Sequence, residues 1–488
     1  MNSTQFKLSK ATLAIALAAL AGCAVGPDYV APKTDLAPFH NTANVAAAGA
    51  RAVPALDQWW LGFDDPLLVK IVQRALDQNL DLEASLARVR QARAAASGAG
   101  AELLPSIDLG GSAVAEHQSL QGPIGSITRG SPAFRRNIQD YSVGPAASWE
   151  IDLFGGNRRA SQAARLEAQA AEADAAGTRV SVAADAADAY FQIRGYQARL
   201  AIAQRQISIE EDLLRIVRDR YAAGAAQGRE IAQADALVKQ ARAVAPPLQI
   251  GLELQLNRLD VLMGAQPGTY AKELATVQDI PSLPAVPGDD APREVLRNRP
   301  DVIAAEHRLA ASNERIGVAV SGYYPKISLS GALGFDSLGG SRLFTSNAFQ
   351  ASGGVGLRWR LFDFGRVDAE IAQAKGANEE ALAAYRLSVL RAAEDVENAF
   401  VVLSQTQLHV IQLQDEVKSL VRARELSEQA YRSGTVSLTE VLDADRELLA
   451  ARDELDANRA GAARAAVAVF RALGGGWESK PSVQTAKN

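Results

Sequence analysis

Two long stretches of the chain carry small apolar residues at three- and four-residue spacings and contain no proline. They run from Gly155 to Gly224 and from Gly365 to Gly434 and are rich in Ala, Glu, Gln and Arg. This spacing predicts helices, and at ~1.5 Å per residue each helix would be roughly 100 Å long. We expect Gly224 and Gly434 to end them in the left-handed conformation. Helices of that length do not fit one compact helical domain, so the pattern favours a coiled-coil-like assembly.

Apolar and polar residues alternate in four shorter segments. These segments include residues 107–109 and 143–151 in the first half of the chain, and 327–333 and 355–361 in the second. A period of two predicts strands. Charged residues alternate there with Trp, Leu and Val, and Gly-rich turns follow. This combination favours strands with lipid on one face and water on the other, although a soluble sheet could also show the alternation.

The sequence repeats itself. The run from Arg220 to Gly224 is echoed by the run from Ala430 to Gly434, 210 positions later (434 − 224 = 210), and Trp149 and Trp359 keep that offset. Further upstream the offset is 220, because the first copy carries about ten more residues near the loop 118–136. Gene duplication is the simplest account. Each copy then consists of a helix, two strands, a long helix and a return helix.

Shorter helices complete each copy. The apolar spacing predicts opening helices over residues 66–104 and 292–323, and return helices over residues 227–263 and 437–473. Pro246-Pro247 is expected to interrupt the first return helix, because proline lacks the N–H that the helix ladder needs.

The amino terminus resembles a secretory signal with a site for lipid attachment. Lys7 and Lys10 precede the apolar run 11–20, which is too short to span a bilayer permanently, and Leu20-Ala-Gly-Cys23 follows. Leu-Ala-Gly-Cys resembles a bacterial lipobox, which implies cleavage before Cys23 and acylation of that residue, the only cysteine. The alternative is an ordinary signal peptide with an incidental cysteine.

Composition and charge exclude several function classes. The chain has 488 residues, with 51 Lys+Arg against 56 Asp+Glu, and this net charge of −5 argues against a nucleic-acid partner. Four His and one Cys without ligand or catalytic spacing make a metal site and an enzyme improbable. Met263 is the only methionine besides Met1, which disfavours export of soft metal cations. No cofactor is expected apart from the lipid on Cys23.

The expected organisation follows from these patterns. It comprises a signal peptide (1–22), a lipidated N-terminal extension (23–65), the first repeat (66–265), a Pro-rich equatorial connector (266–291), the second repeat (292–475) and a disordered tail (476–488). Beyond the signal no apolar run is long enough for a membrane helix, so any crossing should be made of strands. Four strands cannot close a barrel, so the chain should oligomerise; two copies would supply eight strands and three would supply twelve.

Several motifs stand in order along the mature chain: Cys23-Ala-Val-Gly-Pro-Asp-Tyr29, Trp59-Trp60 with Phe63-Asp-Asp-Pro66, Arg299-Pro-Asp-Val-Ile-Ala-Ala-Glu306, Ile316-Gly317 and Tyr324-Pro325. Together they resemble the TolC-type outer membrane factors, in the OprM/NodT lipoprotein branch. The resemblance implies an α+β membrane protein in which three chains form a 12-stranded outer-membrane β-barrel, continued by a 12-helix α-barrel that crosses the periplasm and carries an equatorial belt. It also implies a periplasmic adaptor and an inner-membrane RND pump as partners, and no chemistry at this protein.

The turns farthest from the strands should form the periplasmic mouth. Glu440 and Asp443 are spaced i, i+3, so they share a helix face, and threefold symmetry would make them a ring of six carboxylates. The resemblance places a closing network on Tyr431, Glu440 and Asp443, with Arg229 and Glu230 as the matching positions in the first copy. We predict that Arg229 and Tyr431 hydrogen-bond to the acids across neighbouring helices. For Glu440 the alternative is a capping box that begins at Ser437.

The preferred function is an exit duct for drugs or other small solutes. The outer channel of a type I protein-secretion system and a non-conducting structural envelope lipoprotein remain as alternatives. The substrate cannot be named from the sequence, because in this architecture the pump and the adaptor select it.

Overall fold

The computed structural model describes residues 24–33, 37–41, 53–128, 130–132, 134–287 and 296–478. The chain forms two compact units. The strand unit comprises 1–32, 90–170 and 306–384, and the helix unit comprises 33–89, 171–305 and 385–488. Both units draw on both sequence repeats, so the duplication does not divide the chain into two separate domains. The predicted signal peptide and Cys23 lie outside the described residues.

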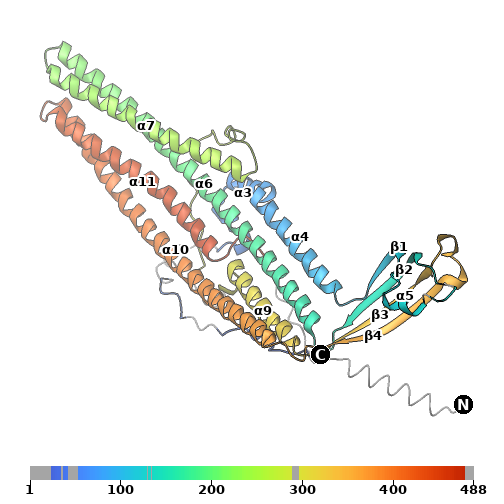
Figure 1. The fold of residues 1–488 in the computed structure, drawn as a ribbon. Coiled ribbons are helices and arrows are strands. Elements are labelled where there is room, and N and C mark those ends of the chain that lie inside the picture. Colours follow the sequence, from blue (N-terminus) through green and yellow to red (C-terminus); the bar gives the residue numbers. More distant parts are fainter. Residues whose placement is uncertain are drawn as a thin grey trace. The chain divides into compact units, whose positions relative to one another are not determined.

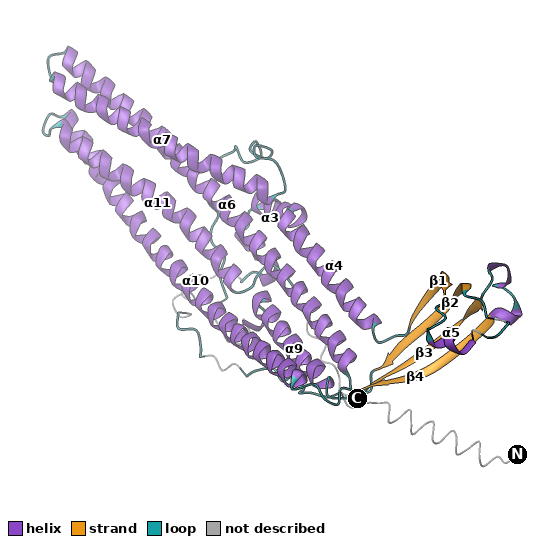
Figure 2. Cartoon of the chain, viewed as in Figure 1, coloured by secondary structure: helices purple, strands orange, loops and turns teal. Residues whose placement is uncertain are grey.

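The strand unit holds one antiparallel sheet in the order β1-β2-β3-β4 (Figure 2). The two central strands come from different repeats and pair from Tyr141 opposite Ser337 to Ile151 opposite Ile327. The predicted strands are confirmed, although the last one ends earlier than the alternation of residues 355–361 suggests. The strands are β1 (Ser106–His117), β2 (Asn137–Ile151), β3 (Lys326–Ser337) and β4 (Phe349–Arg358).

Two tryptophans at matching positions of the repeat make the same kind of hydrogen bond at the ends of the two strand pairs. The indole N–H of Trp149 donates to the carbonyl oxygen of Leu103 at 2.9 Å, and that of Trp359 donates to the carbonyl oxygen of Tyr323 at 3.0 Å. Each bond joins the end of a hairpin's second strand to the residues just before its first strand. The duplicated tryptophans therefore hold the sheet to the helices within one chain.

Two hairpins of long helices dominate the fold (Figure 1). Helices α6 (Gly156–Ala222) and α10 (Arg366–Arg432) have 67 residues each, and their return helices α7 (Gly228–Leu262) and α11 (Leu438–Ala472) have 35 each. The two long helices and the return helices are confirmed. Gly224 and Gly434 follow α6 and α10 at φ 74° and 78°, the left-handed conformation that the sequence predicts.

The proline pair does not interrupt α7, and this prediction was wrong. The helix runs unbroken from Gly228 to Leu262 with Pro246 and Pro247 inside it. Both prolines are exposed, as are Arg242 and Ala243, whose carbonyl oxygens lose their helical donors. Water can bind these oxygens on the exposed face, so the lost bonds are tolerated.

The opening helix of the first repeat, in contrast, is broken where no break was predicted. Asn79 separates α3 (Pro66–Gln78) from α4 (Leu80–Ala101). Its side-chain oxygen accepts the N–H of Leu82 at 3.0 Å, and its amide donates to the carbonyl oxygen of Leu262 at 3.0 Å. Asn79 therefore caps α4 and fastens it to the end of α7.

The remaining elements are short except for α9. In the second repeat α9 begins at Pro300, and residues 292–295 of the predicted opening helix lie outside the described part of the chain. None of the helices in the described ranges is both long and apolar enough to cross a membrane. These elements are α9 (Pro300–Ser321), α5 (Pro123–Thr128) and the 3-10 helices η1 (Leu56–Phe63), η2 (Gly340–Arg342) and η3 (Ser346–Ala348).

Aromatic side chains form the core of the helix unit around η1. Trp59 is completely buried and stacks on Phe470, with ring centroids 5.4 Å apart, and Phe63 packs on Phe191 at 4.9 Å. The segment before α3 is therefore pinned against α6 and α11.

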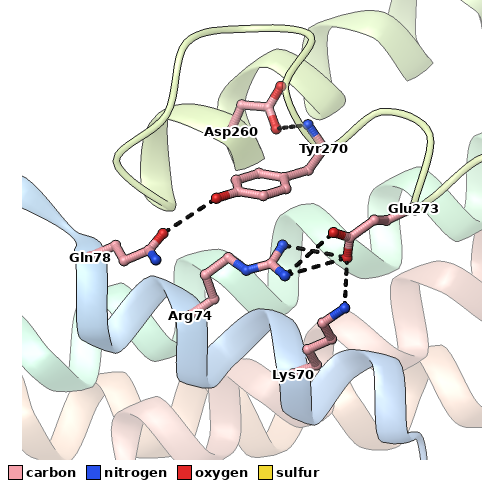
Figure 3. A network of polar contacts seen from close by, with 6 residues as sticks. All are labelled: Lys70, Arg74, Gln78, Asp260, Tyr270 and Glu273. Atoms are coloured by element: carbon pink, nitrogen blue, oxygen red, sulfur yellow. Dashed lines mark hydrogen bonds and ion pairs between the residues drawn. The ribbon is translucent and has the colours of Figure 1, made fainter.

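The connector after α7 is held to the helix unit by a polar network (Figure 3). The carboxylate of Asp260 accepts the backbone N–H groups of Gly268, Thr269 and Tyr270. Further along, Glu273 pairs with Lys70 at 3.0 Å and with Arg74 at 3.4 Å.

The predicted disordered tail does not begin at Gly476. The N–H of Gly476 donates to the carbonyl oxygen of Leu56 at 2.9 Å, and its own carbonyl accepts from Arg179 at 2.9 Å. Residues 479–488 lie outside the described residues, so the rest of that prediction is not addressed.

Candidate functional site

The ends of the two hairpins pack on each other through an apolar cluster. Residues of α6 and α7 meet residues of α10 and α11, so the two turns are held side by side within the helix unit. The cluster consists of Leu213, Leu214, Val217, Ala234 and Val238 from one hairpin, and Tyr431, Leu438, Val441 and Leu442 from the other.

Tyr431 lies inside this cluster. It is 4% exposed, the guanidinium of Arg220 lies over its ring at 4.5 Å, and Arg220 also donates to its carbonyl oxygen at 3.2 Å. The phenol oxygen is buried and has no hydrogen-bond partner within the described chain. Burial raises the pKa of Tyr431, and nearby Glu230 adds to this while Arg220 opposes it.

Glu440 and Asp443 lie on an exposed face of α11, as their spacing predicts. Asp443 pairs with Arg446 on its own helix at 3.5 Å, and the carboxylate of Glu440 has no ion pair among the residues described. Ser437 is the N-cap of α11 but makes no side-chain capping bond. The capping box considered for Glu440 is therefore not observed.

The capping box occurs instead in the first copy, at α7. Glu230 accepts the backbone N–H of Gln227 at 3.2 Å and completes a reciprocal pair with the Gln227 side chain. Arg229 is exposed beside it. Within one chain the structure does not bring Arg229 or the Tyr431 hydroxyl to Glu440 or Asp443. Contacts between subunits stay a prediction.

Sequence reasoning missed a group of buried charges one turn away from this cluster. Glu210 precedes Leu213 by three positions, and Asp445 follows Leu442 by three, so each occupies the apolar stripe of its helix. Both are buried, and Arg424 of α10 reaches Asp445. A charged residue at a position of the apolar stripe was the available signal.

The Arg299-Pro-Asp motif has a structural role. The guanidinium of Arg299 pairs with Asp301 at 2.8 Å and with Asp395 at 2.9 Å, and it donates to the carbonyl oxygen of Ala472 at 2.9 Å. It therefore joins the start of α9 to α10 and to the end of α11.

The residues just after Cys23 are fixed to the strand unit. The N–H of Val25 donates to the carbonyl oxygen of Phe154 at 3.1 Å. Arg159 is 6% exposed and binds Glu314 at 2.9 Å and Asp28 at 3.0 Å. Gly26, at φ 98°, lies so close to Gly317 that a Cβ there would be 2.5 Å from its Cα, so only glycine fits.

The profile of one protein family matches most of the chain. The outer membrane efflux protein family matches residues 71–265 and 291–475. This chain belongs to that family. The family is non-enzymatic, and the protein is an outer membrane exit channel of an efflux system.

Relatives with assigned names support this efflux family assignment. The chain is 32% identical over 433 residues to the pyoverdine export outer membrane protein OpmQ of Pseudomonas aeruginosa, covering 89% of this chain and 90% of that protein. It is 30% identical over 429 residues to nodulation protein T of Rhizobium leguminosarum bv. trifolii, covering 88% and 89%. The solved outer-membrane channel OprN has a TM-score of 0.84 and 34% identity, covering 93% of this chain and all of that one. The resemblance to the OprM/NodT branch of outer membrane factors is therefore confirmed.

Proposed function

We propose that three copies of this efflux protein form one conduit, with twelve strands in the outer membrane and a tunnel of twelve helices behind them. In this proposal an acyl chain on Cys23 anchors each subunit, and a periplasmic adaptor and an inner-membrane RND pump deliver drugs or other small solutes. The observation that carries the proposal is the duplicated sheet, in which β1 and β4 are exposed edges along their whole length. Such edges need a partner strand in a membrane.

The repeat indicates how a neighbouring copy would complete the sheet. Within the chain, β2 of the first repeat pairs with β3 of the second, and Phe154 stacks on Tyr324 with ring centroids 4.5 Å apart. In the other repeat, the residue that matches Phe154 is Phe364 (offset 210), and the residue that matches Tyr324 is Leu104 (offset 220). Phe364 is fully exposed and Leu104 is 67% exposed. We infer that Phe364 of one copy contacts Leu104 of the next, beside a β4–β1 pair.

A pair of cysteines tests this contact. In a Cys23→Ser background, Phe364→Cys with Leu104→Cys is expected to cross-link the subunits into a covalent trimer, because the closed ring brings each pair within disulfide distance. Denaturing electrophoresis without reductant measures the product. The matched control is Phe154→Cys with Tyr324→Cys, which should form a bond inside one chain and migrate as a monomer. Monomers from both pairs would contradict the proposed ring.

Conductance tests the channel and its mouth together. Planar-bilayer recordings of the acylated protein should give small current steps that grow several-fold in the variant Glu440→Ala with Asp443→Ala. In the proposed mouth these two acids, exposed on one face of α11, make the contacts that keep the channel closed, and alanine removes those contacts. Asp415→Ala, another exposed acid that pairs with Lys418, is the control and should leave the steps unchanged. Unchanged steps in the double variant would remove these acids from the gate. A trimer without conductance in any form would favour the structural lipoprotein.

The type I secretion channel is separated from the efflux duct by a cellular test. Deletion of the protein should sensitise the cells to small toxic solutes and leave secreted proteins unchanged. Loss of a secreted protein without loss of resistance would favour the secretion channel.

A further inference from the structure

Three helices of the helix unit enclose a group of charged side chains one turn away from the apolar cluster at the hairpin ends. Glu210 on α6 is 4% exposed and Asp445 on α11 is 3% exposed. Arg424 on α10 lies with them and donates from Nε to the carboxylate of Asp445 at 2.9 Å. Charges this deeply buried are costly unless they are paired, so their arrangement calls for an explanation.

Pairing in this group is incomplete. Arg424 also donates to Glu428 at 2.5 Å, and Gln206 donates to Glu210 at 2.6 Å. One oxygen of Glu210 (Oε2) and one of Asp445 (Oδ2) are buried without a hydrogen-bond partner in the part of the chain that the structure describes. Arg424 therefore hydrogen-bonds two carboxylates, Asp445 and Glu428, and acts on the buried Glu210 only through its charge.

Among the other charges in the neighbourhood, Glu428 and Arg452 act on Asp445 with opposite sign. The described polar groups around the pair include Arg205 and Gln206 of α6, Glu428 of α10 and Arg452 of α11. Burial raises the pKa of Glu210, and the charge of Asp445 raises it further against Gln206 and Arg424. Burial also raises the pKa of Asp445, with Arg424 and Arg452 opposing and Glu428 adding to the shift. Both carboxyl groups therefore release their protons at a higher pH than ordinary carboxylic acids do.

The duplication shows that this group is specific to one of two related positions. By the repeat offset of 210, Leu420 is the residue that matches Glu210, and Leu214 is the residue that matches Arg424. Asp445 corresponds to Asp235, which pairs with Lys239 on its own helix at 2.7 Å. The related position thus has leucines in place of Glu210 and Arg424, so it lacks the buried pair of acids that could respond to protons in this way.

We propose that Glu210, Arg424 and Asp445 form a protonation-dependent latch that positions the α10–α11 hairpin, and with it Tyr431, against α6. The latch holds while one of the two carboxyl groups keeps its proton. When both are ionised, two buried negative charges face one guanidinium, and their repulsion loosens the hairpin. This role rests on the proposed channel function, because the hairpin ends would form the mouth.

The test is the pH profile of conductance for the full-length acylated protein. Wild-type current steps should grow as the pH rises from about 5 to about 8, the range above an ordinary carboxyl pKa. Glu210→Gln should lose this rise and keep small steps throughout, because its amide cannot ionise. Glu211→Gln is the matched control, since Glu211 is exposed and pairs with Arg242 on the neighbouring helix. It should keep the wild-type profile.

Thermal unfolding separates failure of the latch from failure of the channel proposal. A carboxyl group whose pKa is higher in the folded state than in the unfolded state binds its proton more tightly when folded, so stability falls as the pH rises. Glu210→Gln should therefore melt above the wild type at neutral pH, and the difference should vanish at acidic pH. If the wild type does not conduct, this melting difference still decides the latch.

Asp445→Asn serves as a second variant if Glu210→Gln does not fold, and it should likewise flatten the conductance profile. A Glu210→Gln protein with the wild-type pH profile in both conductance and melting would overturn the proposal.

Discussion

Replacing Trp59 with alanine is expected to lower the free energy of unfolding of the helix unit by about 3–5 kcal/mol, the usual cost of removing a large buried aromatic side chain. Trp59 is completely buried and stacks nearly parallel on Phe470, with an angle of 4° between the rings. It also makes edge contacts with Trp60 and Phe63, so truncation would leave a cavity lined by aromatic rings. No smaller neighbour can fill such a cavity fully, because the interior is close-packed.

Chemical denaturation followed by tryptophan fluorescence and circular dichroism measures this loss. The matched control is Leu61→Ala in the same 3-10 helix, where the side chain is 46% exposed and the change should stay within about 0.5 kcal/mol. Equal losses in the two variants would show that η1 does not contribute to the core through Trp59. Conductance of the folded Trp59→Ala protein should be normal. Its stacking partner Phe470 lies near the end of α11, far along that helix from the apolar cluster at the hairpin ends.

Replacing Arg159 with alanine is the second large change, and its effect should concentrate on the residues that follow Cys23. Arg159 joins Glu314 of α9 to Asp28, and it also donates to the carbonyl oxygen of Gly26. Without the guanidinium, the largely buried carboxylate of Glu314 loses its partner. Breaking a buried pair in this way costs about 3–5 kcal/mol. Residues 24–33 should then detach from the strand unit.

Hydrogen exchange at the N–H of Val25, which donates to Phe154, reports this detachment directly, together with limited proteolysis after residue 28. Arg165→Ala on the same helix is the control, because Arg165 is exposed and makes no ion pair in the described residues. An Arg159→Ala protein with wild-type exchange at Val25 would show that Gly26 and Gly317 hold the segment without the arginine. Glu314→Gln should have a milder effect, since it removes the buried charge together with the pair.

Several parts of the fold could be predicted because they depend on neighbouring residues. The periods of two and of about 3.6, the glycines that end α6 and α10, and the 210-residue repeat are all local or comparative signals. The break at Asn79 was missed, because it depends on a bond to Leu262, which is 183 positions away. The continuity of α7 through Pro246 was missed because it depends on which face of the helix meets water.

The hairpin ends show the same division. Their location, the exposure of Glu440 and Asp443, and their common face follow from helix geometry alone. Which residue of the hairpin ends is buried does not follow from that geometry. Tyr431 and Tyr221 occupy matching positions in the two repeats, yet Tyr431 is 4% exposed and Tyr221 is 51% exposed. The difference arises because only Tyr431 packs between the two hairpins.

The sequence by itself thus determined the order of the elements and the place of the hairpin ends, because periodicity depends on short stretches of chain. Its motifs, by their resemblance to known ones, indicated a duplicated, helix-rich class of outer membrane channels. Only the tertiary structure decided which charges are buried together. Glu210 and Asp445 are 235 positions apart (445 − 210 = 235) in the sequence and belong to different repeats. Packing of α6 against α11 removes both carboxyl groups from water. This burial raises the affinity of a carboxylate for its proton, and no local sequence pattern encodes it.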